Sequence, residues 1–376
     1  MSSRRKRIFT PRRRTVASKR WTTVLGSFFY PVWSDADSNG FIAPLKHDKV
    51  QFKGPAVIYP VNRLNETPLD VFTVIGEGVD TVGPLAKRCQ ATERGIRILC
   101  DYLTILGCLS KSEQRYALTL DSKTFLDRRS PAYQGSSSGF LALPETVNAF
   151  MHLSETIRTG RPPLGAGEGS VSHENPIWVD FARSMVPLTL PVAEEVARAL
   201  EADRGQKWKV LDIAAGHGLF GIAIAERNPN AEIFAQDWPR VLEVAEGNAR
   251  ARGVARRFHC LPGSAFEVDF GSGYDVVLIT NFLHHYDPAT NEGLLRKIRK
   301  SMAADGRVVT MDLVPNPDRV SPPRAASFSL MMLGMTRDGD AYTFAEYDEM
   351  FRHAGFSSSV LHSMTPRGHS LIFSRP

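Results

Sequence analysis

Two adjacent histidines are the side chains of this sequence best suited to proton transfer. His284 and His285 occur in NFLHHY, directly after the apolar run Tyr274–Thr280, which predicts a strand. A free imidazole has a pKa near 6.5, so a positioned histidine can take a proton from a hydroxyl at neutral pH. Asp312 ends another predicted strand, Arg307–Asp312, and can accept the imidazole N–H, as an aspartate does in hydrolase triads. The pattern predicts a general base.

The histidine pair has two other interpretations. Adjacent histidines are often surface groups near a helix end. His284, His285 and Asp287 also suggest a metal site, but no spaced partner completes it. We therefore expect no metal.

A glycine-rich loop provides a second candidate site. The segment Val210–Gly221 reads VLDIAAGHGLFG, which is an apolar strand, a loop of small residues and the start of a helix. Gly216, Gly218 and Gly221 allow a backbone to approach a ligand closely at a helix N-terminus. Asp237 ends the next predicted strand, where a carboxylate can bind ribose hydroxyls. This pattern fits a dinucleotide and S-adenosylmethionine alike.

Three features favour S-adenosylmethionine. Asp212, just before the loop, would repel a pyrophosphate but suits a cofactor with an amino group and a sulfonium cation. The sequence shows no second nucleotide-binding half after the fourth predicted strand. Its last two predicted strands, Ser357–Ser363 and Ser370–Ser374, form a hairpin through Thr365–Gly368, which a six-stranded parallel dinucleotide fold does not have.

The elements that position these residues alternate from Lys207 onward, and such alternation predicts a parallel sheet covered by helices. The fold class is therefore α/β, and the C-terminal hairpin requires at least one antiparallel strand. The other predicted strands are Lys209–Ile213, Glu232–Gln236, Tyr274–Thr280 and Arg307–Asp312.

The preceding part of the chain is mostly helical. We predict helices over Leu69–Ile75, Val82–Cys89 and Thr92–Gly107, with Thr92 as an N-cap, and then a hairpin over Cys108–Leu120. Three helices and a two-stranded wing form a winged-helix outline. The presumed recognition helix is mostly apolar beyond Arg94 and Arg97, which favours a buried or dimer-forming module over a DNA-binding one.

Two further helices are predicted between these parts, near Pro144–Arg158 and over Trp178–Leu200, with Gly/Ser/Pro-rich connections around the first. The chain divides into a basic, disordered leader (1–65), a winged-helix-like domain (66–175) and a cofactor-binding domain (176–376). Nine Lys or Arg residues and no Asp or Glu lie among the first 20 residues, while the net charge of the whole chain is +6. The rest of the chain is therefore mildly acidic, and nucleic acid is not its expected partner.

The four cysteines form no C-x-x-C pair, which fits a reducing, cytoplasmic location. No apolar run approaches the roughly 20 residues of a membrane span, so no membrane partner is expected.

From Leu69 to Pro376 the sequence resembles the small-molecule O-methyltransferases that include caffeate-type and acetylserotonin-type enzymes. The resemblance rests on five motifs in order, VLDIAAGHG, FAQDWPRVL, PGSAF, NFLHHYDP and DLVPNPD. It implies a winged-helix dimerisation domain, hence a homodimer, followed by a class I methyltransferase domain that uses S-adenosylmethionine.

The resemblance also assigns roles. His284 aligns with the family's catalytic base, while His285 and Tyr286 replace an Asp and a Trp. Asp312 aligns with an acid that orients the base, and a second such acid falls near Ala341, with Asp340 beside it. Together with Asp212, the expected cofactor contacts are Ala214, Gly216, Gly218, Asp237, Ser264 and Ala265. The two alanines of the loop, where glycine is common, are tolerable if they need no positive φ.

The acceptor is expected to be a small hydroxylated, aromatic molecule, because thioethers adapt to flat rings and make sulfur–aromatic contacts. The residues expected to line its pocket are Phe181, Met185, Met331, Met332 and Met335. Other reactions on the same scaffold remain open, namely N- or C-methylation, decarboxylation and hydroxylation, as does a non-catalytic winged-helix regulator.

Overall fold

The computed structural model describes residues 69–137, 150–163, 176–363 and 369–376. The predicted leader 1–65, the turn 365–368 and the start of the helix predicted near 144–158 lie outside them. The rest of that helix is α8 (Leu153–Thr159). None of the helices in these ranges is long and apolar enough to cross a membrane.

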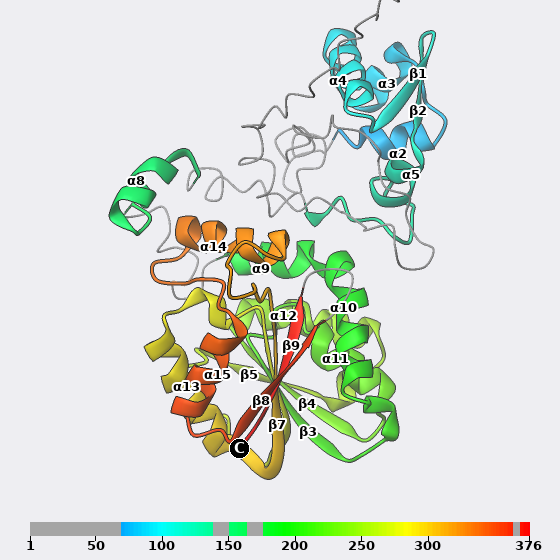
Figure 1. Cartoon of the computed structure of the whole chain (residues 1–376). Coiled ribbons are helices and arrows are strands. Elements are labelled where there is room, and N and C mark those ends of the chain that lie inside the picture. Colours follow the sequence, from blue (N-terminus) through cyan, green and yellow to red (C-terminus); the bar gives the residue numbers. More distant parts are fainter. Residues whose placement is uncertain (1–68, 138–149, 164–175, 364–368) are drawn as a thin grey trace, which may run out of the picture.

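The N-terminal part consists of three helices, a hairpin and a fourth helix (Figure 1). These are α2 (Val71–Gly76), α3 (Val82–Arg88), α4 (Glu93–Ile105), β1 (Leu109–Ser112), β2 (Arg115–Leu118) and α5 (Leu120–Phe125). The three helices and the hairpin follow the predicted order. Thr92 caps α4, since its side chain accepts a hydrogen bond from the N–H of Gly95 at 3.1 Å. Cys89, Cys100 and Cys108 are buried and form no disulfide bond among the described residues.

The C-terminal part contains a seven-stranded sheet in the order β5-β4-β3-β6-β7-β9-β8. The strands are β3 (Trp208–Ile213), β4 (Ala231–Asp237), β5 (Phe258–Pro262), β6 (Tyr274–Thr280), β7 (Met302–Asp312), β8 (Ser358–Ser363) and β9 (Ser370–Arg375). The first five strands in this order run parallel, and β9 runs antiparallel to both β7 and β8. The predicted α/β class and its antiparallel terminal hairpin are confirmed.

Helices cover both faces of this sheet, as Figure 1 shows. One apolar core includes residues of α10 (Val186–Ala199), α11 (Leu219–Arg227) and α12 (Pro239–Ala251). The other includes residues of α13 (Pro288–Ser301) and α15 (Phe344–His353). Burial of strands on both faces explains their nearly continuous apolar sequences.

Three elements of the structure differ from the predictions. The single helix expected over 178–200 is two helices, α9 (Ile177–Ser184) and α10, which meet at Met185. Pro187 lies in the first turn of α10, where its missing N–H is tolerated. In the middle of one continuous helix over 178–200 the same proline would remove a backbone hydrogen bond. Strand β5 was not predicted, because its partly exposed residues show neither an apolar run nor alternation. Strand β7 begins five residues early, across an irregularity in its pairing with β6.

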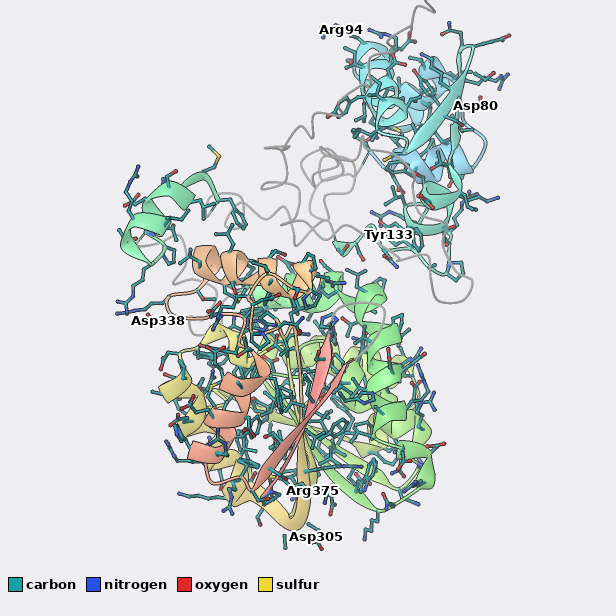
Figure 2. The ribbon with its side chains drawn as sticks, viewed as in Figure 1. Asp80, Arg94, Tyr133, Asp305, Asp338 and Arg375 are labelled. Carbon is teal, nitrogen blue, oxygen red and sulfur yellow. The ribbon has the colours of Figure 1, made fainter. Side chains whose placement is uncertain are left out.

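The parallel strands bring their carboxyl ends to one edge of the sheet. Asp338 lies toward this edge, while Asp305 and Arg375 lie at the opposite end (Figure 2). Two non-glycine residues with left-handed backbones follow strands at this edge, Ala214 (φ 50°) after β3 and Asn281 (φ 50°) after β6. Such conformations are strained and concentrate at functional sites.

Candidate active site

The glycine loop joins β3 to α11 and folds over the end of β4. Ala214, Gly216 and Gly218 all have positive φ, at 50°, 57° and 73°. The N–H of Ala215 donates to the carbonyl of Gln236 at 3.0 Å. The two alanines were expected to be tolerated if they need no positive φ. Ala214 does not meet this condition, because the neighbouring strand fixes the path of the loop.

Asp212 lies beneath this loop. It is fully buried, and its Oδ2 accepts a hydrogen bond from the N–H of Gly221 at 3.1 Å. A Cβ on Gly221 would overlap Ile233 and crowd this carboxylate, which explains the third glycine. Burial raises the pKa of Asp212 to about 7. Its one hydrogen bond among the described residues holds the first turn of α11, while its Oδ1 is buried without a partner among them, so contact of Asp212 with the cofactor stays a prediction.

Asp237 ends β4 and is nearly buried, with 9% exposed. Its two oxygens accept hydrogen bonds from the N–H groups of Gly216 at 2.8 Å and Trp238 at 2.7 Å. Each oxygen keeps a lone pair, so the carboxylate can still accept from the two hydroxyls of a ribose. Burial raises the pKa of Asp237 to about 6. These features fit the nucleoside part of S-adenosylmethionine.

Gln236 connects the loops on either side of Asp237, a role that the sequence analysis missed. Its Oε1 accepts from the N–H of Ala214 at 3.2 Å, and its Nε2 donates to the carbonyl of Gly263 at 2.6 Å. The buried amide therefore ties the glycine loop to the loop after β5, which contains the expected cofactor contacts Ser264 and Ala265.

Ser264 and Ala265 border a group of aromatic rings. Ala265 is buried, and the Ser264 hydroxyl accepts from the N–H of Phe266. The Phe266 and Tyr286 rings are 4.9 Å apart, and those of Phe282 and Tyr286 are 5.3 Å apart. Burial, then the charge of Asp237, raises the pKa of Tyr286 to about 12. These rings therefore lie near Asp237 and offer apolar surface to a flat base.

His284 lies on the short 3₁₀ turn η3 (Leu283–His285) after β6 and is 4% exposed. Its Nδ1 donates to Asp312 at 2.8 Å from Oδ1 and 3.0 Å from Oδ2. Asp312, at the end of β7, is 1% exposed. Because a carboxylate cannot donate, the proton of the neutral ring is on Nδ1 and the lone pair is on Nε2. The structure thus brings the predicted base and acid into direct contact.

Two neighbouring segments fix η3 from outside. The Asn291 amide donates to the carbonyls of Leu283 at 2.9 Å and Tyr286 at 3.2 Å. Gly339 packs so closely that any Cβ there would overlap the carbonyl oxygen of His284. The ring of His284 therefore sits on a backbone held on both sides.

His285 has different surroundings. Its ring lies 4.3 Å from that of His284 and 5.4 Å from that of Trp178, and its Nδ1 is buried without a hydrogen bond among the described residues. Burial, then the neighbouring His284, lowers the pKa of His285 well below 6.5. Of the two histidines, only His284 has a carboxylate partner in the part of the chain that the structure describes.

Aromatic side chains surround the dyad of His284 and Asp312. Phe328, on α14 (Pro323–Met335), packs edge to face on His284 at 4.8 Å, and Trp178 on α9 packs on Phe181 at 5.7 Å. Neither side chain was predicted, although Trp178 lies one helical turn before Phe181 and Phe328 precedes the methionines of α14.

The predicted methionines are spread along this region. Met331 and Met332 are buried in α14, Met335 ends that helix, and Met185 lies at the junction of α9 and α10. Their contact with an acceptor remains a prediction.

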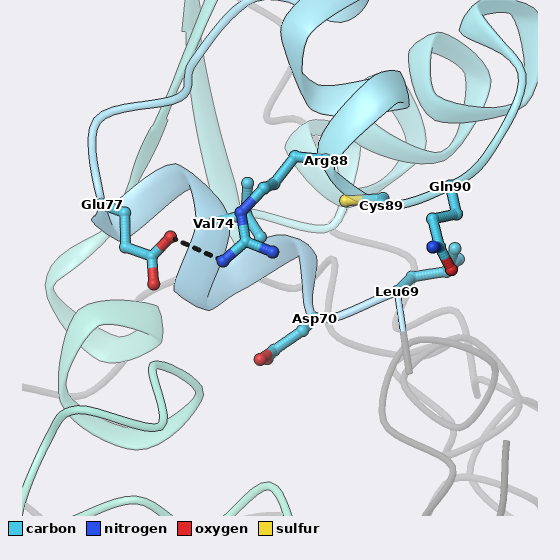
Figure 3. Close-up of a pocket in the computed structure, with 7 residues that line it drawn as sticks. All are labelled: Leu69, Asp70, Val74, Glu77, Arg88, Cys89 and Gln90. Carbon is cyan, nitrogen blue, oxygen red and sulfur yellow. Dashed lines mark ion pairs between the residues drawn. The ribbon is translucent and has the colours of Figure 1, made fainter. Parts of the chain in front are cut away.

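Other candidate sites carry less chemistry. The described residues contain no group of three or more His, Cys, Asp or Glu side chains able to hold a metal. A cavity of about 220 Å³ lies in the N-terminal part, where Glu77 and Arg88 form an ion pair at 3.5 Å (Figure 3). It is lined by residues 69–90 and is separate from the strand ends that hold the dyad.

Comparisons with known proteins agree with this arrangement. An O-methyltransferase domain model matches residues 181–357. A solved chain from Nostoc punctiforme, described as an O-methyltransferase, is 48% identical and superimposes with a TM-score of 0.80 over 85% of this chain and 95% of that one. The 3-hydroxy-5-methyl-1-naphthoate 3-O-methyltransferase of Streptomyces sahachiroi is 25% identical over 76% of this chain and 83% of its own length.

A more distant structure shares the fold. Human N-acetylserotonin methyltransferase, solved in complex with S-adenosylmethionine, is 19% identical, with a TM-score of 0.72 over 85% of this chain and 93% of that one.

Relief of the loop strain is testable. We expect Ala214→Gly to raise the free energy of unfolding by up to about 1 kcal/mol, because glycine adopts positive φ without a steric cost. The control Ala215→Gly should lower it by about 1 to 2 kcal/mol, since a buried methyl is lost. Urea denaturation measures both, and equal destabilisation of the two variants would contradict the strain.

Cofactor binding should depend on pH through Asp237. Burial favours the neutral acid, so the carboxyl takes up a proton as pH falls through about 6 and loses an acceptor for the ribose. Calorimetry with S-adenosylhomocysteine should show constant affinity above about pH 7 and a loss approaching about tenfold per pH unit below 6. Asp237→Asn should bind weakly at every pH. A slope that persists in this variant would assign the proton to another group, such as Asp212.

Proposed function

The chain belongs to the family of S-adenosylmethionine-dependent O-methyltransferases, and from this premise we propose that it methylates a hydroxyl of a small aromatic molecule with His284 as general base. The observation that carries the proposal is the buried dyad of His284 and Asp312 at the same sheet edge as the glycine loop.

The cofactor would be held by the loops after β3, β4 and β5. The backbone at Gly216 and Gly218 gives close approach, and Asp237 accepts from the ribose hydroxyls. The rings of Phe266 and Tyr286 offer apolar surface to adenine. S-Adenosylmethionine, when bound, supplies a methyl group activated by a sulfonium.

The base works on the acceptor hydroxyl. A phenol with a pKa near 10 is mostly protonated at neutral pH and is a poor nucleophile. Nε2 of His284 takes the hydroxyl proton as the oxygen attacks, while the hydrogen bond from Nδ1 to Asp312 holds the ring in the required tautomer. The imidazolium that forms then lies beside a buried carboxylate that offsets its charge.

The acceptor class follows from the surroundings of His284. Phe328 and His285 contact its ring, and Trp178 lies beyond His285. Aromatic walls favour flat rings through edge-to-face contacts. The Streptomyces sahachiroi relative is named for a hydroxynaphthoate, which supports an aromatic acceptor here as well.

Methyl transfer from labelled S-adenosylmethionine to a panel of phenols and hydroxynaphthoates tests this function. We expect His284→Ala to lower kcat/KM by about 10²- to 10⁴-fold, because the base is lost. His285→Ala should lose at least about tenfold less, since its ring has no carboxylate partner. Turnover in His284→Ala equal to that of wild type would overturn the assignment.

His353 provides a matched control for this experiment. Its Nδ1 lies 2.8 Å from Glu292 in a comparable histidine–carboxylate pair, but the pair is exposed on α13 and α15. His353→Ala should turn over like wild type.

We also propose that the chain forms a homodimer through α4. Ile98, Tyr102 and Ile105 are 45%, 38% and 76% exposed and recur at helical spacing on one face. Of the basic side chains nearby, Arg97 and Lys111 share Asp101, which offsets part of their charge. An exposed apolar stripe suits a second protein surface rather than a nucleic acid.

Light scattering tests the dimer. Ile105→Lys should shift the protein from dimer to monomer, because a charge in an apolar interface is desolvated without a partner. The control Ile157→Lys, at a residue 60% exposed on α8, should leave the dimer intact. A monomeric wild-type protein would refute the proposal.

A further inference from the structure

Tyr347 contacts the dyad of His284 and Asp312 through its hydroxyl. It lies on α15 and is fully buried, and its hydroxyl donates to Asp312 Oδ2 at 2.9 Å. A capping box between Thr343 and Glu346 starts α15 one turn earlier, so the position of the phenol is fixed by the helix N-terminus. The contact joins residues 35 positions apart in the sequence.

Asp312 thereby receives three donors. Oδ1 accepts from His284 Nδ1 and from the N–H of Leu313, both at 2.8 Å, and Oδ2 accepts from Tyr347. Hydrogen bonds to an ionised acceptor are stronger than neutral ones and fix its orientation. Without Tyr347, Oδ2 would keep only its longer contact with His284, at 3.0 Å.

The second acid implied by the family resemblance does not reach this dyad. Its position is Ala341, which is buried, and the adjacent Asp340 is 40% exposed and pairs with Arg319 at 3.3 Å. Of the carboxylates that the structure describes, only Asp312 bonds to His284. In place of a second acid, the neutral phenol of Tyr347 donates a hydrogen bond to Asp312.

We propose that Tyr347 is a positioning residue that orients Asp312 and reduces its negative charge toward His284, in place of a second carboxylate. The inference rests on the proposed role of His284 as the base. By donating to Oδ2, the phenol withdraws charge from the carboxylate. The imidazolium of His284 therefore gives up its proton more readily than it would beside an unshielded carboxylate.

The phenol stays a donor throughout the working range of pH. Burial, then the charge of Asp312, raises the pKa of Tyr347 well above 10. The other titratable groups around it are Tyr342, whose ring lies 5.8 Å away, and Glu346, which pairs with Arg319. On the far side of the dyad lies His285, which burial keeps neutral.

Tyr347→Phe isolates the hydroxyl, because the ring and its packing are kept. We expect the acid limb of the kcat/KM profile to move upward by about one pH unit, since an unshielded carboxylate holds the imidazolium more strongly. At a pH well above the limb, kcat should fall by about tenfold at unchanged KM, because Asp312 is less well oriented.

Tyr342→Phe is the matched control. Its hydroxyl is equally part of the buried cluster but donates to the backbone carbonyl of Tyr286 at 2.6 Å rather than to the dyad. A variant with merely weakened packing would lose activity without a shift of the acid limb. We expect that behaviour from Tyr342→Phe and the shifted limb only from Tyr347→Phe.

Nuclear magnetic resonance of histidine-labelled protein gives a readout without turnover. The His284 signal, assigned by its loss in His284→Ala, should titrate at higher pH in Tyr347→Phe than in wild type. An unmoved signal would overturn the role of Tyr347, whatever the activity. A moved signal in a protein whose His284→Ala variant still turns over would support the hydrogen-bond effect and refute the base, so the two proposals fail separately.

Discussion

Buried carboxylates at the ends of parallel strands need hydrogen-bond donors, and here backbone N–H groups of the adjoining loops and of the first turn of α11 provide them. Asp212 accepts from Gly221, Asp237 accepts from Gly216, and Asp312 accepts from Leu313. A buried carboxylate without such donors would be costly. Asp212 and Asp312 therefore fix the segments that follow their own strands, Asp237 fixes the glycine loop after the neighbouring strand β3, and together they shape the edge where the cofactor and the acceptor are proposed to meet.

This arrangement has a conformational cost. Ala214 and Asn281 both adopt left-handed backbones directly after β3 and β6. The structure over-determines them, because Gln236 accepts from the N–H of Ala214 and the N–H of Asn281 donates to the carbonyl of Met311 on the neighbouring strand. The strain is located where the backbone turns sharply from a strand toward the ligand side.

The acids also differ in what they can do. Burial raises the pKa of Asp237 to about 6 and that of Asp212 to about 7, because it disfavours the ionised form of both carboxyls. Asp312 instead has three donors, including a phenol and an imidazole. A carboxylate with that many donors is held in one orientation beside the imidazole, as the proposed chemistry requires.

The sequence alone determined the fold class and the two members of the dyad, because apolar periodicity marks the strands and the motifs place His284 and Asp312 at strand ends. It could not decide which neighbours complete the site. The burial of Asp212, the positive φ of Ala214 and the contact of Tyr347 with Asp312 arise from packing between segments that are distant in the chain. Such contacts leave no local pattern, so only the tertiary structure decided them.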